Sequence, residues 1–223
     1  MKAYVICVLV LTVSAASILL SPIGTAFAAG GQAMDLVRSI KAFYFKDASD
    51  FAVDFKVNSK MKDISFDGSF MFKPPMSFAV EAKSPALQLK IAFREGNGFI
   101  YLPAANMITN LDKLTQAKTR SVQIPKSMTE LDTHIEKLPT EFDLTVTADA
   151  LTKISGKSKK ARGSFDAFVD PKTSELKSIM TFNNKGDEEI SIEVKNFRRI
   201  KIDNTVFDKP QGAVETNLPI PIF

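Results

Sequence analysis

The chain has 223 residues, of which 45% are hydrophobic and 24% are charged. This composition is typical of a globular protein of one domain. It excludes an intrinsically disordered chain, a collagen-like repeat and a membrane protein with many spans. The 29 basic and 25 acidic side chains nearly balance, at a formal net charge of +4. We therefore expect no nucleic-acid partner.

The first 28 residues have the pattern of a secretory signal peptide. A basic residue precedes an apolar run over residues 3–20, and the helix breakers Pro22 and Gly24 separate that run from the small-x-small sequence at 26–28. This order predicts cleavage at the end of that sequence. The alternative is an uncleaved membrane anchor, because the apolar run is almost long enough to span a bilayer.

The only cysteine, Cys7, lies inside this signal. Residues 29–223 therefore have no thiol for catalysis, for a disulfide or for lipidation, and their only histidine is His134. We expect residues 29–223 to form a single soluble domain in the periplasm of a bacterial cell envelope. We also expect it to be monomeric and to need no metal or other cofactor.

Apolar residues at helical spacing predict three helices. The first covers residues 32–45. Another begins at Ser127, where Glu130 completes a capping box, and ends at Pro139. The third is short, lies between these two in the chain, and has a stripe made of Met107, Ile108, Leu111 and Leu114.

Alternation of apolar and polar residues predicts about five strands before the two later helices and about five after them. They cover residues 51–57, 64–72, 76–82, 87–93, 99–102, 142–148, 163–169, 176–182, 190–194 and 200–207. Because such alternation gives each strand one apolar face, we predict an α+β protein that is mainly β. Its core would be one strongly curved antiparallel sheet, with helices packed on the apolar face.

Phenylalanine is concentrated on these apolar faces, at Phe51, Phe55, Phe66, Phe70, Phe72, Phe78 and Phe93. A sheet must bury one face, so an ordinary hydrophobic core explains the pattern. The other interpretation is that three short helices do not fill a wide, curved face. The unfilled part would then be a long, dry cavity that suits an acyl chain.

The sequence has no Gly-x-Ser-x-Gly elbow, no phosphate-binding glycine loop and no His-Glu-x-x-His motif. His134 falls on the polar side of its predicted helix, which is typical of a solvated side chain. The acidic cluster at 187–189 follows a turn, as solvated sheet edges often do. We therefore expect no catalytic residue and no enzymatic activity.

A basic run lies in the second half of the chain, at Lys153, Lys157, Lys159, Lys160 and Arg162. It could contact anionic lipid headgroups or an acidic partner. The alternative is a charged hairpin tip, which the absence of interleaved aromatic residues favours.

Four features follow one another along the chain. A signal peptide precedes an amphipathic helix, and a strand at 68–73 enters Pro74-Pro75 and continues through Phe78. Residues 96–103 read as a glycine-rich hairpin, and residues 206–213 read Val-Phe-Asp-Lys-Pro-Gln-Gly-Ala. In this order they resemble the periplasmic lipoprotein carriers of Gram-negative bacteria, the LolA-like family with the lipoprotein-localisation fold.

The resemblance implies an unclosed half-barrel with helices as a lid over its concave face. It also implies a carrier that takes lipoprotein acyl chains, or another lipid such as a phospholipid, from an inner-membrane ABC transporter complex to an outer-membrane receptor. Phe78 matches a family aromatic of the cavity. We predict a cavity lined by Phe55, Phe66, Phe70, Phe72, Phe78, Val80, Leu89, Ile91, Phe93 and Ile100. The lid would carry Met107, Ile108, Leu111 and Leu114.

One departure from the family concerns the latch of this lid. The best-known carriers have an arginine between the lysine and the proline of the Lys-x-Pro passage, whereas this chain has Pro74. Proline has no donor that could hold a lid closed. Another lipid could therefore be the cargo. Independently of this departure, a lipid- or lipoprotein-sensing regulatory module of the envelope is an alternative function, and an envelope hydrolase that uses His134 is a third.

Overall fold

The structure is a computed structural model, and it describes residues 29–61, 63–85, 87–111, 125, 127–159 and 163–216. In these residues one sheet of twelve strands follows the order β12-β6-β5-β4-β3-β2-β1-β11-β10-β9-β8-β7. The strands before the second long helix are β1 (Phe51–Ser59), β2 (Ile64–Lys73), β3 (Ser77–Lys83), β4 (Gln88–Arg94), β5 (Asn97–Leu102) and β6 (Met107–Asn110). Those after it are β7 (Phe142–Thr147), β8 (Thr152–Ser158), β9 (Ser164–Val169), β10 (Leu176–Phe182), β11 (Glu188–Arg199) and β12 (Val214–Glu215).

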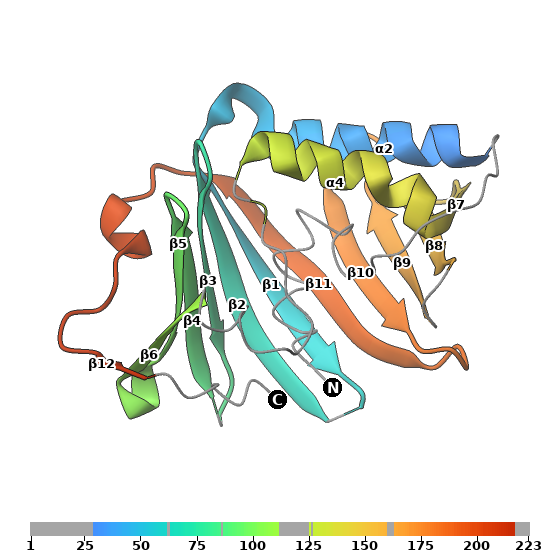
Figure 1. The fold of residues 1–223 in the computed structure, drawn as a ribbon. Coiled ribbons are helices and arrows are strands. Elements are labelled where there is room, and N and C mark those ends of the chain that lie inside the picture. The colour runs from blue at the N-terminus through green and yellow to red at the C-terminus, as the bar shows by residue number, and fades with distance from the viewer. Residues whose placement is uncertain are drawn as a thin grey trace.

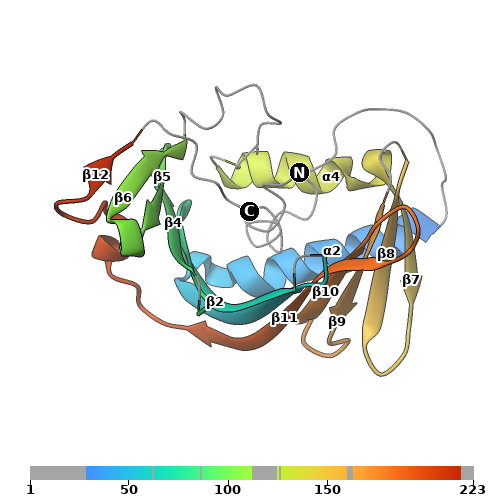
Figure 2. The same cartoon turned by 90° about the horizontal axis from the view of Figure 1, so that it is seen from below.

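The two halves of the sheet join where β1 pairs antiparallel with β11, from Phe51 opposite Arg199 to Ser59 opposite Ile190. Every pairing is antiparallel except that of β12 with β6. Figures 1 and 2 show that the sheet curves around two helices without closing, so that β12 and β7 form its free edges. The predicted α+β, mainly β half-barrel is confirmed.

Two long helices lie on the concave side, α2 (Ala29–Phe45) and α4 (Met128–Glu141) (Figure 2). The Ser127 hydroxyl caps α4 by accepting a hydrogen bond from the Glu130 amide at 3.1 Å, as the capping box predicted. The prediction that Pro139 ends this helix is wrong, since α4 continues to Glu141. A proline this close to the C-terminus removes only one amide from the last turn. Neither helix is long and apolar enough to cross a membrane, among the residues described here.

The main hydrophobic core fills the concave side of the sheet. It joins residues of α2 and α4 to the inward-facing residues of β1–β5 and β7–β11. Its largest fully buried members include Phe51, Phe55, Phe78 and Leu131. Period-two alternation predicted this face correctly because every second residue of an antiparallel strand points to the same side.

A second, smaller core lies on the outward face of β3–β6. Ala79, Ala92 and Phe99 stand opposite one another on neighbouring strands, and Phe207 packs onto them together with Ile202. Phe207 belongs to the 3-10 turn η3 (Asn204–Phe207). Residues 200–207 were predicted to be the last strand, and this prediction is wrong, because β11 ends at Arg199 and none of these residues belongs to a strand. The small alanines leave space for the C-terminal segment to cross the outside of the sheet.

Residues 107–110 were predicted to be helical, and this prediction is also wrong. They form β6, whose backbone is hydrogen-bonded to β5 on one side and to β12 on the other. Strand β8, in turn, lies where the basic run was interpreted as a hairpin tip. This strand was missed because Gly156 and the lysines give it few apolar residues. Position 156 is a glycine because the ring of Phe165 occupies the space that a side chain there would need.

Candidate binding site on the concave face

Helices α2 and α4 lie side by side over the second half of the sheet, where both pack against β7 (Figures 1 and 2). Each contributes one apolar stripe to the core. From α4 the stripe consists of Leu131, Ile135 and Leu138, all at most 5% exposed. Among the described residues, these two helices cover the concave face, whereas residues 107–110 form a strand of the sheet.

Two ion pairs join α2 to α4 on the solvent side; we call them the α2–α4 clasp. The guanidinium of Arg38 donates to both carboxylate oxygens of Glu136, at 3.1 Å from Nε and 2.9 Å from its terminal nitrogen. Lys41 bonds to Asp132 one turn along. The hydrogen bonds from Arg38 hold the pKa of Glu136 below its ordinary value, so Glu136 is charged at neutral pH.

A partly enclosed chamber of about 60 Å³ lies beneath the clasp, between the two helices and β7–β10. Its walls are apolar except at Lys41 and Tyr44. The residues that line it are Val37, Ile40, Lys41, Tyr44, Phe45, Ile135, Leu138, Leu144, Ile154, Phe165, Ala167, Leu176 and Ile179. It is less than half the size of an apolar cavity of about 150 Å³ that accommodates benzene. In this closed arrangement it has room for a few atoms of a ligand, not for a whole acyl chain.

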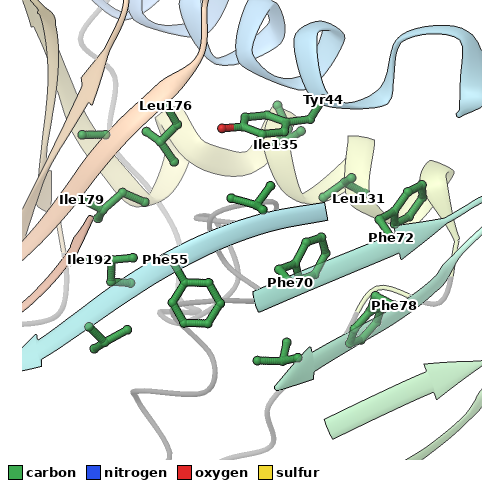
Figure 3. Close-up of a cluster of buried hydrophobic side chains, with 14 of the residues drawn as sticks. Tyr44, Phe55, Phe70, Phe72, Phe78, Leu131, Ile135, Leu176, Ile179 and Ile192 are labelled. Atoms are coloured by element: carbon green, nitrogen blue, oxygen red, sulfur yellow. The ribbon is translucent and has the colours of Figure 1, made fainter. Parts of the chain in front are cut away.

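Tyr44 places the only hydroxyl on the wall of this chamber. The residue is 5% exposed, and its hydroxyl has no hydrogen-bond partner. Burial raises the pKa of the phenol, and the carboxylate of Glu175 raises it further, whereas the Leu176 amide acts in the opposite direction. Figure 3 shows the hydroxyl of Tyr44 on the side facing Leu176, above Ile135.

The ten residues predicted to line a cavity come together on one face. All belong to the main core, and nine are at most 5% exposed, while Phe66 is partly buried. Phe78 stacks between Phe93 and Phe70, with ring centroids 5.2 and 6.2 Å away. They lie on β1–β5, whereas the chamber lies over β7–β10, and none of the ten is among its lining residues. That they bind lipid therefore stays a prediction.

The chamber and this phenylalanine face are connected by aromatic contacts. The ring of Tyr44 lies 5.7 Å from that of Phe51, which in turn lies 5.9 Å from Phe70 and 5.2 Å from Phe72. The ring contacts from Tyr44 through Phe51 and Phe70 to Phe78 therefore join the two halves in one apolar layer of buried side chains.

The first two predicted lid residues, Met107 and Ile108, lie in strand β6 and not in a helix. Ile108 is 1% exposed and belongs to the second core, on the outward face. Met107 neighbours it in β6, and Leu111 follows that strand and packs on the main core. Leu114 lies outside the described residues. The assignment of Ile108 to a lid is wrong, because β6 is part of the sheet and turns this side chain outward.

The basic run is largely neutralised where the structure describes it. Lys153 pairs with Asp166 at 3.5 Å, and Lys159 pairs with Asp143 at 3.5 Å and donates to the carbonyl of Pro139 at 2.7 Å. Lys160 and Arg162 lie outside the described residues. These pairs reduce the charge available to an anionic lipid surface, and they account for the lysines as structural residues.

His134 lies half-buried on α4, and burial followed by the charge of Lys137 lowers its pKa. It is therefore neutral at pH 7. No group of three or more His, Cys, Asp or Glu side chains that could hold a metal occurs in the described part of the chain. His134 thus offers a lone imidazole on a helix surface.

An open groove of about 760 Å³ lies on the outward side of the first half of the sheet. Its lining is mixed. The side chains of Asp54, Ser69, Glu81 and Lys90 form a row of both charges across neighbouring strands. Two of the predicted cavity residues, Phe55 and Leu89, also line it. Glu81 and Lys90 pair at 3.5 Å. Because charged walls are unsuited to hydrocarbon, the concave side is the better candidate for an apolar ligand.

No protein-family model matches the chain, and no curated protein matches it significantly in sequence. Solved structures do match. An uncharacterized conserved protein from Thermus thermophilus matches 83% of this chain and 98% of its own, with a TM-score of 0.60 and 11% identity. The Pseudomonas aeruginosa MucA/MucB complex contains a chain that matches 80% of this one and 61% of its own, with a TM-score of 0.53 and 10% identity.

The chain shares its fold with these two proteins. Identity this low shows nothing beyond the fold. A LolA superfamily protein from Nitrosomonas europaea also matches, at a TM-score of 0.40 and 9% identity, over 79% of this chain and 97% of its own. The structure itself has the unclosed half-barrel with helices over the concave face that the resemblance to the lipoprotein carriers implied.

Sequence reasoning missed the residues of the chamber on α2, α4 and β7–β10. The apolar stripe of α4 was predicted as one face of a helix, but the sequence did not show that this face packs over β7–β10. Nothing in the local pattern says that β1 pairs with β11, and this pairing decides which half of the sheet the helices cover. The tyrosine at position 44, near the end of the apolar stripe of α2 that includes Val37 and Ile40, was the signal that could have been used.

Proposed function

We propose that the protein is a non-enzymatic carrier that binds the acyl chain of a lipoprotein, or of another lipid, on its concave face. One observation supports this most directly: a single apolar surface continues from the chamber at Tyr44 to the stacked rings of Phe70, Phe78 and Phe93. An apolar layer of this extent provides the length that a hydrocarbon tail needs, and α2 and α4 cover the part of it that lies over β7–β10.

The free energy of binding would come from apolar area. Hiding an acyl chain of about 14–16 carbons from water is worth roughly 0.8 kcal/mol for each CH₂, or about 11–13 kcal/mol in total before costs. Polar contacts on a protein surface supply about 1 kcal/mol each. The carrier would therefore be tolerant of headgroups, and release would require a receptor that offers the tail a comparable apolar groove.

Binding requires α4 to move away from the sheet, because the chamber is far smaller than an acyl chain. The α2–α4 clasp is well placed to control this step. Arg38 and Glu136 are 51% and 56% exposed, so water replaces their contacts when the helices part. Exposed ion pairs of this kind contribute little to stability. They can take the place of the latch that Pro74 cannot form.

The carrier proposal is tested by titrating the purified protein with 1-palmitoyl-lysophosphatidylcholine below its micelle concentration, using calorimetry. We expect saturable binding of one lipid. In the matched locked variant, Arg38→Cys and Glu136→Cys are joined by a short reducible cross-linker on a Cys7→Ser background. This variant should bind no lipid until the link is reduced. Binding that persists with the helices locked would contradict the proposed entry route.

The cellular role proposed by resemblance is transfer from an inner-membrane ABC transporter complex to an outer-membrane receptor, in the periplasm. A regulatory binding module is the second candidate. It is favoured by the fold match to the MucA/MucB complex, in which a chain of this fold is assembled with another protein. This chain spans 61% of that one. Deletion separates the two functions: loss of a carrier leaves lipoproteins in the inner membrane, whereas loss of a regulator changes a stress response without this accumulation.

A further inference from the structure

Tyr44 brings an unused hydrogen-bond donor to the chamber. Its hydroxyl has no partner, although the residue is only 5% exposed. The Leu176 amide acts on the hydroxyl oxygen and lowers the pKa of Tyr44, but an N–H can only donate and so cannot accept the phenolic proton. The phenolic proton therefore has no acceptor among the groups that the structure describes around it.

The other polar group on the chamber wall is already occupied. Lys41 lies three residues before Tyr44 on α2, and its ammonium bonds to Asp132 of α4 at the seam between the helices. Lys41 is partly exposed, whereas Tyr44 lies deeper. A ligand that enters at this seam would pass a charged group first and then meet the free hydroxyl.

A buried donor without an acceptor is unfavourable, and it discriminates between ligands. A plain hydrocarbon in the chamber leaves the hydroxyl unsatisfied. A ligand with a carbonyl oxygen at this depth satisfies it. Because burial raises the pKa of Tyr44, the phenol keeps its proton across the physiological range. It can therefore donate this proton in a hydrogen bond to an acceptor atom of the ligand.

We propose that Tyr44 donates a hydrogen bond to the carbonyl oxygen of the ester or amide that joins an acyl chain to its headgroup. This inference rests on the proposed carrier function and names the ligand chemistry of the same site. The headgroup would lie toward Lys41 at the seam. The tail would run from the chamber past Phe51 to the stacked rings of β2–β4, along the aromatic path already described.

The test compares two soluble lipids that differ in this carbonyl. They are 1-palmitoyl-lysophosphatidylcholine, an ester, and 1-O-hexadecyl-lysophosphatidylcholine, the ether analogue. The wild-type protein should bind the ester about tenfold more tightly, as one hydrogen bond allows. Tyr44→Phe should abolish this preference while still binding both. The matched control is Tyr101→Phe, which removes a hydroxyl bonded to Asn106 on the outward face, and it should keep the preference.

Each outcome is decisive. Equal binding of both lipids by the wild-type protein, or an equal loss of both in Tyr44→Phe, would overturn the role of Tyr44 and leave the carrier function standing. Binding of neither lipid by the wild-type protein would overturn both. Thermal unfolding guards against a misfolded variant: Tyr44→Phe removes an unsatisfied hydroxyl, so its Tm should equal or exceed that of the wild type.

Discussion

Arg38 of α2 and Glu136 of α4 form a two-pronged ion pair, 2.9 and 3.1 Å, across the seam of the two helices that cover the concave face. The pair is 98 residues apart in sequence and exposed to solvent. It therefore joins two segments whose separation would uncover the chamber, at a place where salt and acid can reach it.

The clasp should respond to ionic strength. Raising salt from 0.1 to 1 M shortens the Debye length from about 10 Å to about 3 Å and weakens exposed pairs. Lipid uptake, followed by stopped-flow fluorescence, should become faster as salt is added. The increase should be at most about fivefold, because an exposed ion pair contributes no more than about 1 kcal/mol. The Glu136→Gln variant should take up lipid faster than the wild type at low salt, and its uptake rate should depend less on salt because this ion pair is absent. A double-mutant cycle tests the direct pair: Arg38→Gln should have little further effect on the rate once Glu136→Gln is present, and fully additive effects of the two changes would refute a direct pair.

The clasp should also respond to acid, with a definite sign. The pKa of Glu136 in the folded protein is held below its ordinary value by Arg38. A carboxylate with a depressed pKa contributes stability above its unfolded value and loses it as the pH falls through the folded value. Uptake should be constant near neutrality and accelerate only in acid. Acceleration between about pH 6 and 8, where histidine titrates, would point to another group.

Filling the chamber should stabilise the empty protein and weaken binding. Ala167 lines the chamber between Ile154 and Ile179 on the neighbouring strands. Ala167→Leu adds three carbon atoms to the vacant space, which should raise Tm by a few degrees. It should lower affinity for palmitoyl-lysophosphatidylcholine about tenfold or more. The exposed Ala150→Leu is the control and should change neither. A lower Tm in Ala167→Leu would show that the space is not vacant.

Removing the cap of α4 should loosen the helix over the sheet. The Ser127 hydroxyl accepts from the Glu130 amide at 3.1 Å. Ser127→Ala should lower the free energy of unfolding by about 1 kcal/mol, and Ser127→Asp should restore most of it. Urea denaturation measures both changes. Equal stability of the wild type and Ser127→Ala would exclude a role for the cap.

The stacked phenylalanines should dominate stability on the other half of the sheet. Phe78 is 1% exposed and lies between Phe70 and Phe93, so Phe78→Ala should cost about 3–5 kcal/mol in urea unfolding. Phe66 faces the same side but is only partly buried, and Phe66→Ala should cost clearly less. Equal costs at the two positions would contradict the arrangement of this core.

The predictable part of the fold is the part governed by alternation. Phe51 to Val57 or Leu89 to Phe93 repeat with a period of two because one face is buried, and that face follows from the sequence. Ile108 could not be placed in this way: its neighbours also fit helical spacing, and its burial depends on Phe207, far along the chain. The second core on the outward face is made by such distant segments.

The candidate site was predictable only in part for the same reason. The phenylalanines of β1–β4 were recognised as one buried apolar face, since they repeat along each strand, and their binding of lipid stays a prediction. The chamber was not, because it combines Tyr44, Ile135 and Leu176 from three separated segments. The clasp was equally hidden: Arg38 and Glu136 are ordinary surface charges until α2 and α4 lie side by side.

The central claim is that the concave face holds an acyl chain. The most direct measurement is a native mass spectrum of the protein purified from its own bacterial envelope without detergent. We predict a mass excess equal to one acylated lipid or lipopeptide, which Ala167→Leu reduces. A spectrum with only the bare protein mass, unchanged after incubation with palmitoyl-lysophosphatidylcholine, would contradict the account.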